Sequence, residues 1–104
     1  AGVDQHVMLD IIKRSSGDSI ILRKKVATYV TSGEFGEGMS VNLFYKDQDI
    51  VCELGRELEV PMFVSNAALT VCDWARAAGL AEENWEKLIT LWENLLNIKI
   101  GTKR

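Results

Sequence analysis

A lysine and an aspartate stand side by side in a stretch whose other residues have the spacing of an amphipathic helix. They are Lys46 and Asp47, in the segment YKDQDIV at residues 45–51. Charged groups normally face solvent, and a carboxylate that faces a core must be paired, hydrogen-bonded or open to a cleft. The chemistry of this pair therefore depends on the face of the helix that each side chain occupies.

Helical geometry separates the two charges. With about 100° per residue and Leu43 at zero, the apolar residues around the pair fill an arc centred near 40°. Asp47 falls at about 40°, in the middle of the arc, whereas Lys46 falls near 300°, on its edge, from which a long side chain can extend its ammonium outward. The arc consists of Leu43, Phe44, Ile50, Val51, Leu54 and Leu58.

Three interpretations of Asp47 are open. Its carboxylate bonds backbone amides or a basic residue of a neighbouring helix, or it is the N-cap of a helix that begins later than expected. In the third interpretation, the apolar stripe faces a cleft rather than a core, and Asp47 belongs to a functional site. The first two predict that Asp47 is buried or capping and that Lys46 reaches across.

The spacing of apolar residues is helical nearly throughout, so we expect an all-α domain of about five helices. The expected helices cover residues 4–14, 18–30, 40–58 and 62–79, and a last one carries Trp85 and Trp92. Asp4 is the expected N-cap of the first helix, and the three glycines of residues 31–38 predict a loop. The expected inward residues are Val7, Met8, Ile11, Ile12, Ile21, Leu22, Val26, Val30, Ala67, Ala68, Val71, Ala75 and Ala78.

Size and composition narrow the classes of function. The chain has 104 residues, enough for one domain, and a formal net charge of −3. Its basic residues are scattered apart from RKK at residues 23–25, which argues against nucleic acid as a partner. No apolar run reaches the roughly 18 residues of a membrane span, and no spacing of carboxylates or histidine suggests a metal site.

The thiols and the single histidine favour structural roles. Cys52 and Cys72 lie among helical apolar residues outside any metal-binding spacing, so we expect buried thiols in a reducing, cytoplasmic setting. His6 is expected on the surface of the first helix. The three tryptophans at helical spacing are expected to lie mostly in the core, and the tail GTKR is expected to fray.

Four segments together give the chain a familiar outline. YKDQDIVCE resembles the Lys-Asp signature of the β-hydroxyacid dehydrogenases, a branch of the 6-phosphogluconate dehydrogenase superfamily. AGVDQHVMLDIIKRSSGDS is similar to that family's Gly-(Leu/Val)-Asp helix and its Ser-Ser-Gly-x-Ser loop, and SGEFGEGMSVNLFYKD to its loop before the Lys-Asp helix. ELEVPMFVSNAALTVCDWARAAGLAEENW has the family's helix–Val-Pro–helix–Ala-Gly-Leu layout, so the likeness covers about residues 1–96.

The resemblance implies a role for the whole chain and for single residues. The chain would be the C-terminal helical domain of an enzyme that uses NAD or NADP to oxidise a small hydroxy acid or reduce a semialdehyde. Lys46 would approach the nicotinamide end of the cofactor, and Asp47 would hold that side of the site in place. Ser16 and Gly17 would lie near the substrate mouth, and Met39 occupies a substrate-proximal position where the family often has Phe.

The resemblance also implies what residues 1–104 lack. They include neither a Gly-x-Gly-x-x-Gly motif nor a catalytic-lysine helix, so the N-terminal Rossmann domain would precede Ala1 and no catalytic residue is expected here. We expect no turnover by the isolated chain, and self-association into a homo-oligomer. Ile20 stands where the family often has Trp, and a non-enzymatic dimerisation or partner-binding module remains the alternative. An unrelated helical adaptor with exposed tryptophan anchors is a third possibility.

Overall fold

The computed structural model describes residues 2–100 as helices joined by loops, with no β-strand in that range. The elements are α1 (Gln5–Lys13), η1 (Leu22–Val30), α2 (Val41–Glu57), α3 (Phe63–Ala77), η2 (Trp85–Leu88) and α4 (Ile89–Leu96). Because η2 runs directly into α4, they form five helical units, and the expected all-α class is confirmed. The tail expected to fray lies outside the described residues.

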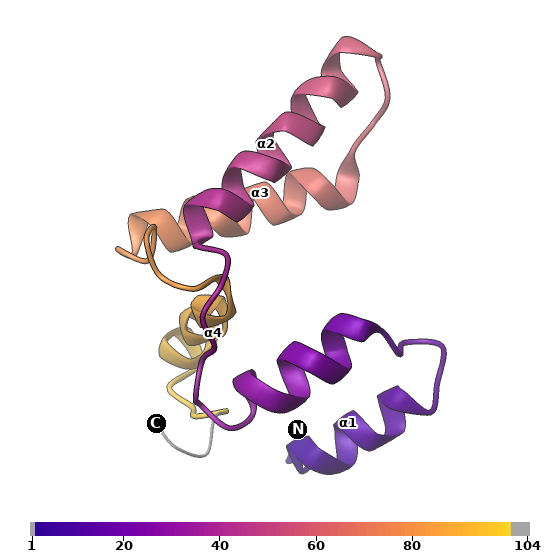
Figure 1. Cartoon of the computed structure of the whole chain (residues 1–104), viewed down its shortest axis with the longest axis vertical. Coiled ribbons are helices and arrows are strands. Elements are labelled where there is room, and N and C mark those ends of the chain that lie inside the picture. Colours follow the sequence, from indigo (N-terminus) through magenta and orange to yellow (C-terminus); the bar gives the residue numbers. More distant parts are fainter. Residues whose placement is uncertain (1, 101–104) are drawn as a thin grey trace.

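The helices form two hairpins rather than one close-packed globule. α2 and α3 run side by side as the longer hairpin, α1 and η1 form a second one, and η2 and α4 lie between them (Figure 1). The radius of gyration is 15.1 Å, whereas a compact chain of this length has about 13 Å. The two hairpins are therefore splayed, and much of their surface is open.

A small apolar core joins the α2–α3 hairpin to the C-terminal helices. Val41 at the start of α2, Ala75 of α3 and Leu91 of α4 are buried together, and Leu80 and Leu88 pack against them. The loop before α2 also bonds to the loop before η2, through Val41 N–H to Glu83 O at 2.8 Å and Trp85 N–H to Met39 O at 2.9 Å. This joint fixes where α2 begins relative to η2.

Buried small residues mark the inner side of the α2–α3 hairpin. Cys52 and Cys72 are free and fully buried between the two helices, which confirms the expected buried thiols. Gly55 is also buried, and a Cβ placed there would collide with the Cγ of Met62 and lie 3.0 Å from the carbonyl oxygen of Val60. At the other end of the hairpin, the Arg76 guanidinium lies 4.1 Å from the centre of the Tyr45 ring.

The second helix differs from the ordinary α-helix that its spacing predicts. η1 is a π-helix, in which the Thr31 N–H at its end donates to Val26 O, five residues back, at 3.1 Å. Residues four and five apart therefore lie on one face. Ser19 caps the entry to this helix by accepting the Leu22 N–H at 3.0 Å.

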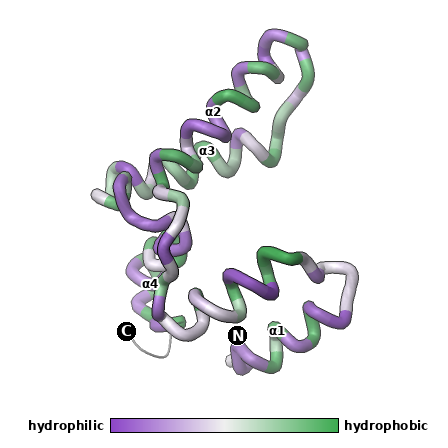
Figure 2. The backbone as a smooth tube through the Cα atoms, viewed as in Figure 1, coloured by the Kyte–Doolittle hydropathy of each residue, from purple (hydrophilic) through white to green (hydrophobic). Residues whose placement is uncertain are grey.

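Several expectations about inward faces are wrong. Leu9 is the buried residue of α1, whereas Val7, Met8 and Ile11 are exposed, and in α3 Ala67 and Ala78 are exposed while Cys72 and Ala75 are buried. Trp74 and Trp92 meet edge to face at the surface, at 38% and 36% exposure, so these two do not lie in a core. Figure 2 shows hydrophobic positions along both hairpins, in keeping with a fold that leaves apolar faces uncovered.

The structure agrees with other local expectations. Asp4 is the N-cap of α1, where its carboxylate accepts the N–H groups of His6 and Val7 at 2.9 and 3.2 Å. His6 itself is exposed.

Candidate functional site

Lys46 and Asp47 are both exposed on the middle of α2. Ser40, not Asp47, is the N-cap of this helix, because its hydroxyl accepts the Leu43 N–H at 3.1 Å. The expectation that Asp47 is buried or capping is therefore wrong. The first two interpretations therefore do not hold in the structure, and the third, in which the stripe faces a cleft, stays a prediction.

The apolar arc of α2 is exposed along with the charged pair. Leu43, Ile50, Leu54 and Leu58 are 45 to 63% exposed. The face that packs on α3 is another one, with Cys52 and Gly55 buried in it. Helices of soluble domains normally bury an arc of large apolar side chains against the core. An exposed arc of this kind, with a carboxylate in its middle and an ammonium at its edge, is typical of a binding surface.

A pocket opens beside the start of this arc. It measures about 500 Å³ and is lined by Ile21, Lys25, Met39, Phe44 and Trp85. Phe44 belongs to α2 and precedes Asp47 by three residues, so the two side chains lie on the same side of the helix. Met39 thus borders a cavity whose wall includes Phe44, one helical turn before Asp47.

Trp85, which was expected to lie in the core, forms part of the wall of this pocket. Its ring stacks on that of Phe44, with centroids 5.9 Å apart and planes inclined by 27°. Its backbone N–H donates to Met39 O at 2.9 Å, and Asn84 caps η2 by accepting the Glu86 N–H at 2.9 Å. These contacts set the positions of Met39, Phe44 and Trp85 relative to one another.

A buried carboxylate behind the pocket was missed by the sequence analysis. Glu86 is 3% exposed; its Oε2 accepts the Gly36 N–H at 3.0 Å, and its Oε1 lies 3.1 Å from the Lys25 ammonium. Asn84 Nδ2 also donates to Gly36 O. The glycine loop, η1 and η2 meet at this carboxylate, and only the Asn–x–Glu capping pattern hints at it in the sequence.

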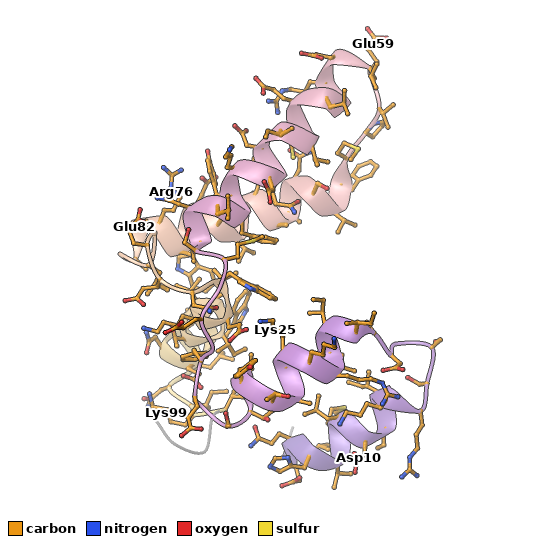
Figure 3. The ribbon with its side chains drawn as sticks, viewed as in Figure 1. Asp10, Lys25, Glu59, Arg76, Glu82 and Lys99 are labelled. Atoms are coloured by element: carbon orange, nitrogen blue, oxygen red, sulfur yellow. The ribbon has the colours of Figure 1, made fainter. Side chains whose placement is uncertain are left out.

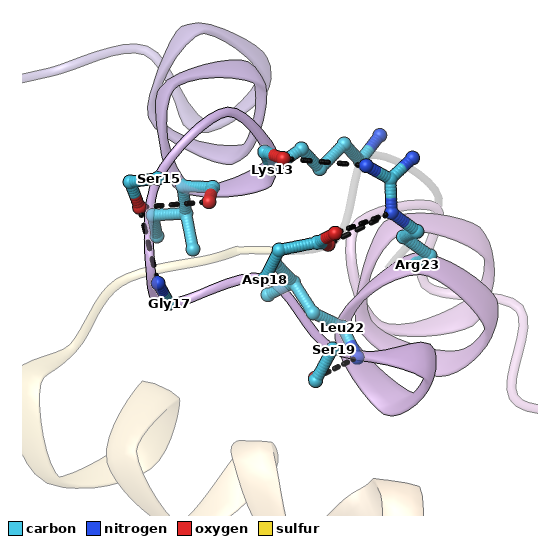
Figure 4. A network of polar contacts seen from close by, with 8 residues as sticks. Lys13, Ser15, Gly17, Asp18, Ser19, Leu22 and Arg23 are labelled. Carbon is cyan, nitrogen blue, oxygen red and sulfur yellow. Dashed lines mark hydrogen bonds and ion pairs between the residues drawn. The ribbon is translucent and has the colours of Figure 1, made fainter.

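Ser16 and Gly17 lie elsewhere, in the exposed turn between α1 and η1, and are not among the residues that line the pocket with Met39. Ser15 Oγ donates to Ile12 O at 2.8 Å and accepts the Gly17 N–H at 3.2 Å (Figure 4). The turn is therefore held in one conformation at some remove from the pocket.

An ion pair fastens the end of that turn. The Arg23 guanidinium donates to both carboxylate oxygens of Asp18, at 2.8 and 3.0 Å, and to Lys13 O at 3.2 Å (Figure 4). The hydrogen bond from Arg23 lowers the pKa of the Asp18 carboxyl below its ordinary value and raises that of Arg23. This pair is structural, because both of its members are engaged with each other and with the turn.

Residues 1–92 match the family model described as the NAD-binding domain of NADP-dependent 3-hydroxyisobutyrate dehydrogenase. The chain belongs to this family. The family binds NAD or NADP, and the resemblance inferred from the four sequence segments is confirmed.

Relatives and a solved structure agree with this assignment. The chain is 30% identical over 100 residues to 2-(hydroxymethyl)glutarate dehydrogenase of Eubacterium barkeri, a match that covers 96% of this chain and 33% of the relative. It is 27% identical over 94 residues to L-threonate dehydrogenase of Cupriavidus necator, covering 90% and 31%. It also shares the fold of a 3-hydroxyisobutyrate dehydrogenase from Salmonella typhimurium, with a TM-score of 0.76 and 24% identity over 86% of this chain and 31% of that one.

The chain spans about a third of the length of these family members. Among residues 2–100, no helix combines the length and the apolar character needed to cross a bilayer.

Proposed function

We propose that the chain is the C-terminal domain of an NAD(P)-dependent oxidoreductase that acts on a small hydroxy acid or semialdehyde. The observation that carries the proposal is the exposure of Lys46 and Asp47 along the open apolar arc of α2, whose Phe44 also lines the pocket bordered by Met39. The names of the relatives support the substrate class, because 2-(hydroxymethyl)glutarate and L-threonate are hydroxy acids.

The exposed pair suits the nicotinamide end of the cofactor. A nicotinamide carboxamide offers N–H donors and a carbonyl acceptor, which complement a carboxylate and an ammonium on neighbouring positions of one helix. The apolar side chains around the pair supply a surface for a planar ring and exclude water from it. When bound, NAD(P) supplies the hydride chemistry. Lys46 and Asp47 orient the cofactor, and Met39 borders the substrate. Ser16 and Gly17, which lie outside the pocket lining, are proposed to stand near the mouth of the completed cleft.

A proton donor or acceptor is also needed for the reaction. We propose that it comes from a segment outside residues 1–104, together with a Rossmann domain. In this proposal, the exposed arc of α2 packs against those parts and closes the cleft over the cofactor.

A titration of the isotope-labelled chain with NADH and NADPH tests the cofactor role. We expect amide chemical shifts to change around Lys46 and Asp47, with binding weakened about 10-fold or more in Lys46→Met and Asp47→Asn, the loss of one hydrogen bond to a charged group. Lys99→Met, an exposed lysine at the other end of the chain (Figure 3), is the matched control. Shifts that avoid α2, or an unchanged affinity in both variants, would contradict the proposal.

The same exposed surface also favours a second candidate, a module for dimerisation or partner binding. Beyond the arc of α2, Phe63 and Val64 at the start of α3 are 82% and 83% exposed, and apolar surface of this kind promotes association. We expect the isolated chain to dimerise in sedimentation experiments and Leu54→Glu to shift it toward monomer. A dimer that binds neither NADH nor NADPH would favour this candidate over the dehydrogenase domain.

A further inference from the structure

The pocket beside α2 shares part of its wall with a second hollow. The second hollow measures about 240 Å³, and its lining includes Ile21, Lys25 and Trp85, which also line the first. Among the described residues that line the first pocket, Lys25 supplies the charge, and the others are aliphatic, aromatic or thioether side chains. A ligand that enters the pocket therefore meets one ammonium on an otherwise apolar wall.

The Lys25 ammonium is held in place and remains reachable. It lies 3.1 Å from Glu86 Oε1 and 5.2 Å from the centre of the Tyr29 ring. Its side chain is 30% exposed, and Figure 3 shows it on the side of η1 that faces the other hairpin. A lysine carries three N–H donors, so pairing with one carboxylate oxygen leaves donors for a second acceptor.

Glu86 is the clamp that sets this position. Its side chain is fully buried, and its other oxygen is occupied by the Gly36 N–H at 3.0 Å. Gly36 and Lys25 thus hold the Glu86 carboxylate from both sides. Because Lys25 and Glu86 form a neutral pair, an anion would be recognised by directed N–H groups in an apolar setting rather than by net charge.

We propose that Lys25 is a specificity residue that binds a second acidic group on the substrate, so that the pocket takes a hydroxy acid with two carboxylates. The aliphatic chain of such a molecule would lie against Met39, Phe44 and Trp85. Its reacting end would lie toward Asp47, one helical turn beyond Phe44, and its far carboxylate would reach the Lys25 ammonium. The inference rests on the proposed function, which supplies the reacting end.

Titrations of the isotope-labelled 104-residue chain with glutarate, butyrate and glutaramide test the proposal. They contrast two, one and no carboxylates on short aliphatic chains. We expect glutarate to shift the indole N–H of Trp85 and the amides of Lys25 and Gly36, and to bind about 10-fold or more tightly than glutaramide, the effect of one hydrogen bond to a charged group. Butyrate, whose single carboxylate can also reach the Lys25 ammonium, should bind nearly as well as glutarate to the isolated chain. Similar binding of all three probes, or no shift at these residues, would overturn the inference.

Variants separate recognition by Lys25 from its structural contact with Glu86. Lys25→Met should lose the preference for glutarate, Lys25→Arg should keep it, and Lys24→Met is the charge-matched control on an exposed neighbour. Glu86→Gln should tighten glutarate binding, because the ammonium loses its competing carboxylate. If Lys25→Met does not fold, the double variant Lys25→Met with Glu86→Gln removes the unpaired carboxylate and serves in its place.

Two failures are distinguishable. A preference for glutarate that survives in Lys25→Met, or in the double variant, would overturn the role of Lys25. If NADH binding at Lys46 and Asp47 then persists, the dehydrogenase proposal still stands. Loss of NADH binding alone would instead contradict the proposed function and leave an acid-binding pocket.

Discussion

The rings of Phe44 and Trp85 are stacked 5.9 Å apart and join the middle of the chain to its C-terminal helices. Phe44 lies one turn before Asp47 on α2, and Trp85 begins η2, where its N–H holds Met39. The proposed cofactor surface and the wall of the pocket thus share one aromatic contact. Substitutions at Phe44 or Trp85 therefore test whether the proposed cofactor surface and the pocket wall depend on each other.

We expect Phe44→Leu to lower the free energy of unfolding by about 1 kcal/mol, since an aromatic pair contributes that much beyond its buried area. Urea denaturation followed by tryptophan fluorescence measures the change. Phe63→Leu is the matched control, because Phe63 is 82% exposed and its replacement should change stability by less than about 0.5 kcal/mol. Equal effects of the two substitutions would contradict the structural role of the stack.

Gly55→Ala should destabilise the chain although alanine is the better helix former. In an open helix the substitution gains about 1 kcal/mol. Here the new methyl would meet Met62 and the Val60 carbonyl in the connection between α2 and α3, so this connection must shift away from α2 at a cost of about 1–3 kcal/mol. Thermal denaturation measures the outcome, with Glu57→Ala at an exposed position two residues further along as control. A higher melting temperature for Gly55→Ala would contradict the close contact at Gly55.

The Cys72 thiol should react slowly in the folded chain. It is fully buried, and burial raises its pKa above the ordinary value, so little thiolate forms at mildly alkaline pH. A thiol-specific reagent added to the Cys52→Ala variant isolates this group. We expect Cys72 of the folded variant to be labelled no faster than the helices open, and to be labelled rapidly in urea. Fast labelling of the folded variant would show that α2 and α3 are not closely packed.

The Asp18–Arg23 pair should make stability depend on acid. The folded pKa of Asp18 is depressed, so its contribution is present above the unfolded pKa and disappears as pH falls through the folded value. Asp18→Asn should therefore be less stable than the parent near neutral pH and converge with it in acid. Denaturation at several pH values measures the difference in stability. In an Arg23→Met background, Asp18→Asn should not lower the stability further. If the two substitutions lower it additively, the two side chains are not coupled.

Local patterns allowed much of the fold to be predicted. The helices, the Asp4 cap and the buried cysteines follow from apolar spacing and from the few residues around them. The inward face of α2 was not predictable in this way. Periodicity locates an apolar stripe, but α2 instead buries the face that carries Cys52 and Gly55.

The Lys25–Glu86 pair was missed for a different reason. Charged residues at such positions are read as solvent-facing, and their partners lie far away in the chain. The π-helix adds to the difficulty, because its Val26–Thr31 hydrogen bond changes which residues share a face with Lys25. Of the expected site residues, Met39 lines the pocket with Phe44, whereas Ser16 and Gly17 lie in a turn outside the pocket lining.

The bond between Gly36 and Glu86 also bears on the order in which the chain folds. It joins residues 50 positions apart, whereas the α2–α3 hairpin is formed by neighbouring segments. Bringing Gly36 and Glu86 together closes a long loop, and this costs chain entropy that is offset only once the contacts around Glu86 are complete. We therefore expect the α2–α3 hairpin to form before the rate-limiting barrier of folding and the Gly36–Glu86 contact after it. In stopped-flow experiments Glu86→Gln should then accelerate unfolding and leave refolding unchanged, whereas Gly55→Ala should slow refolding.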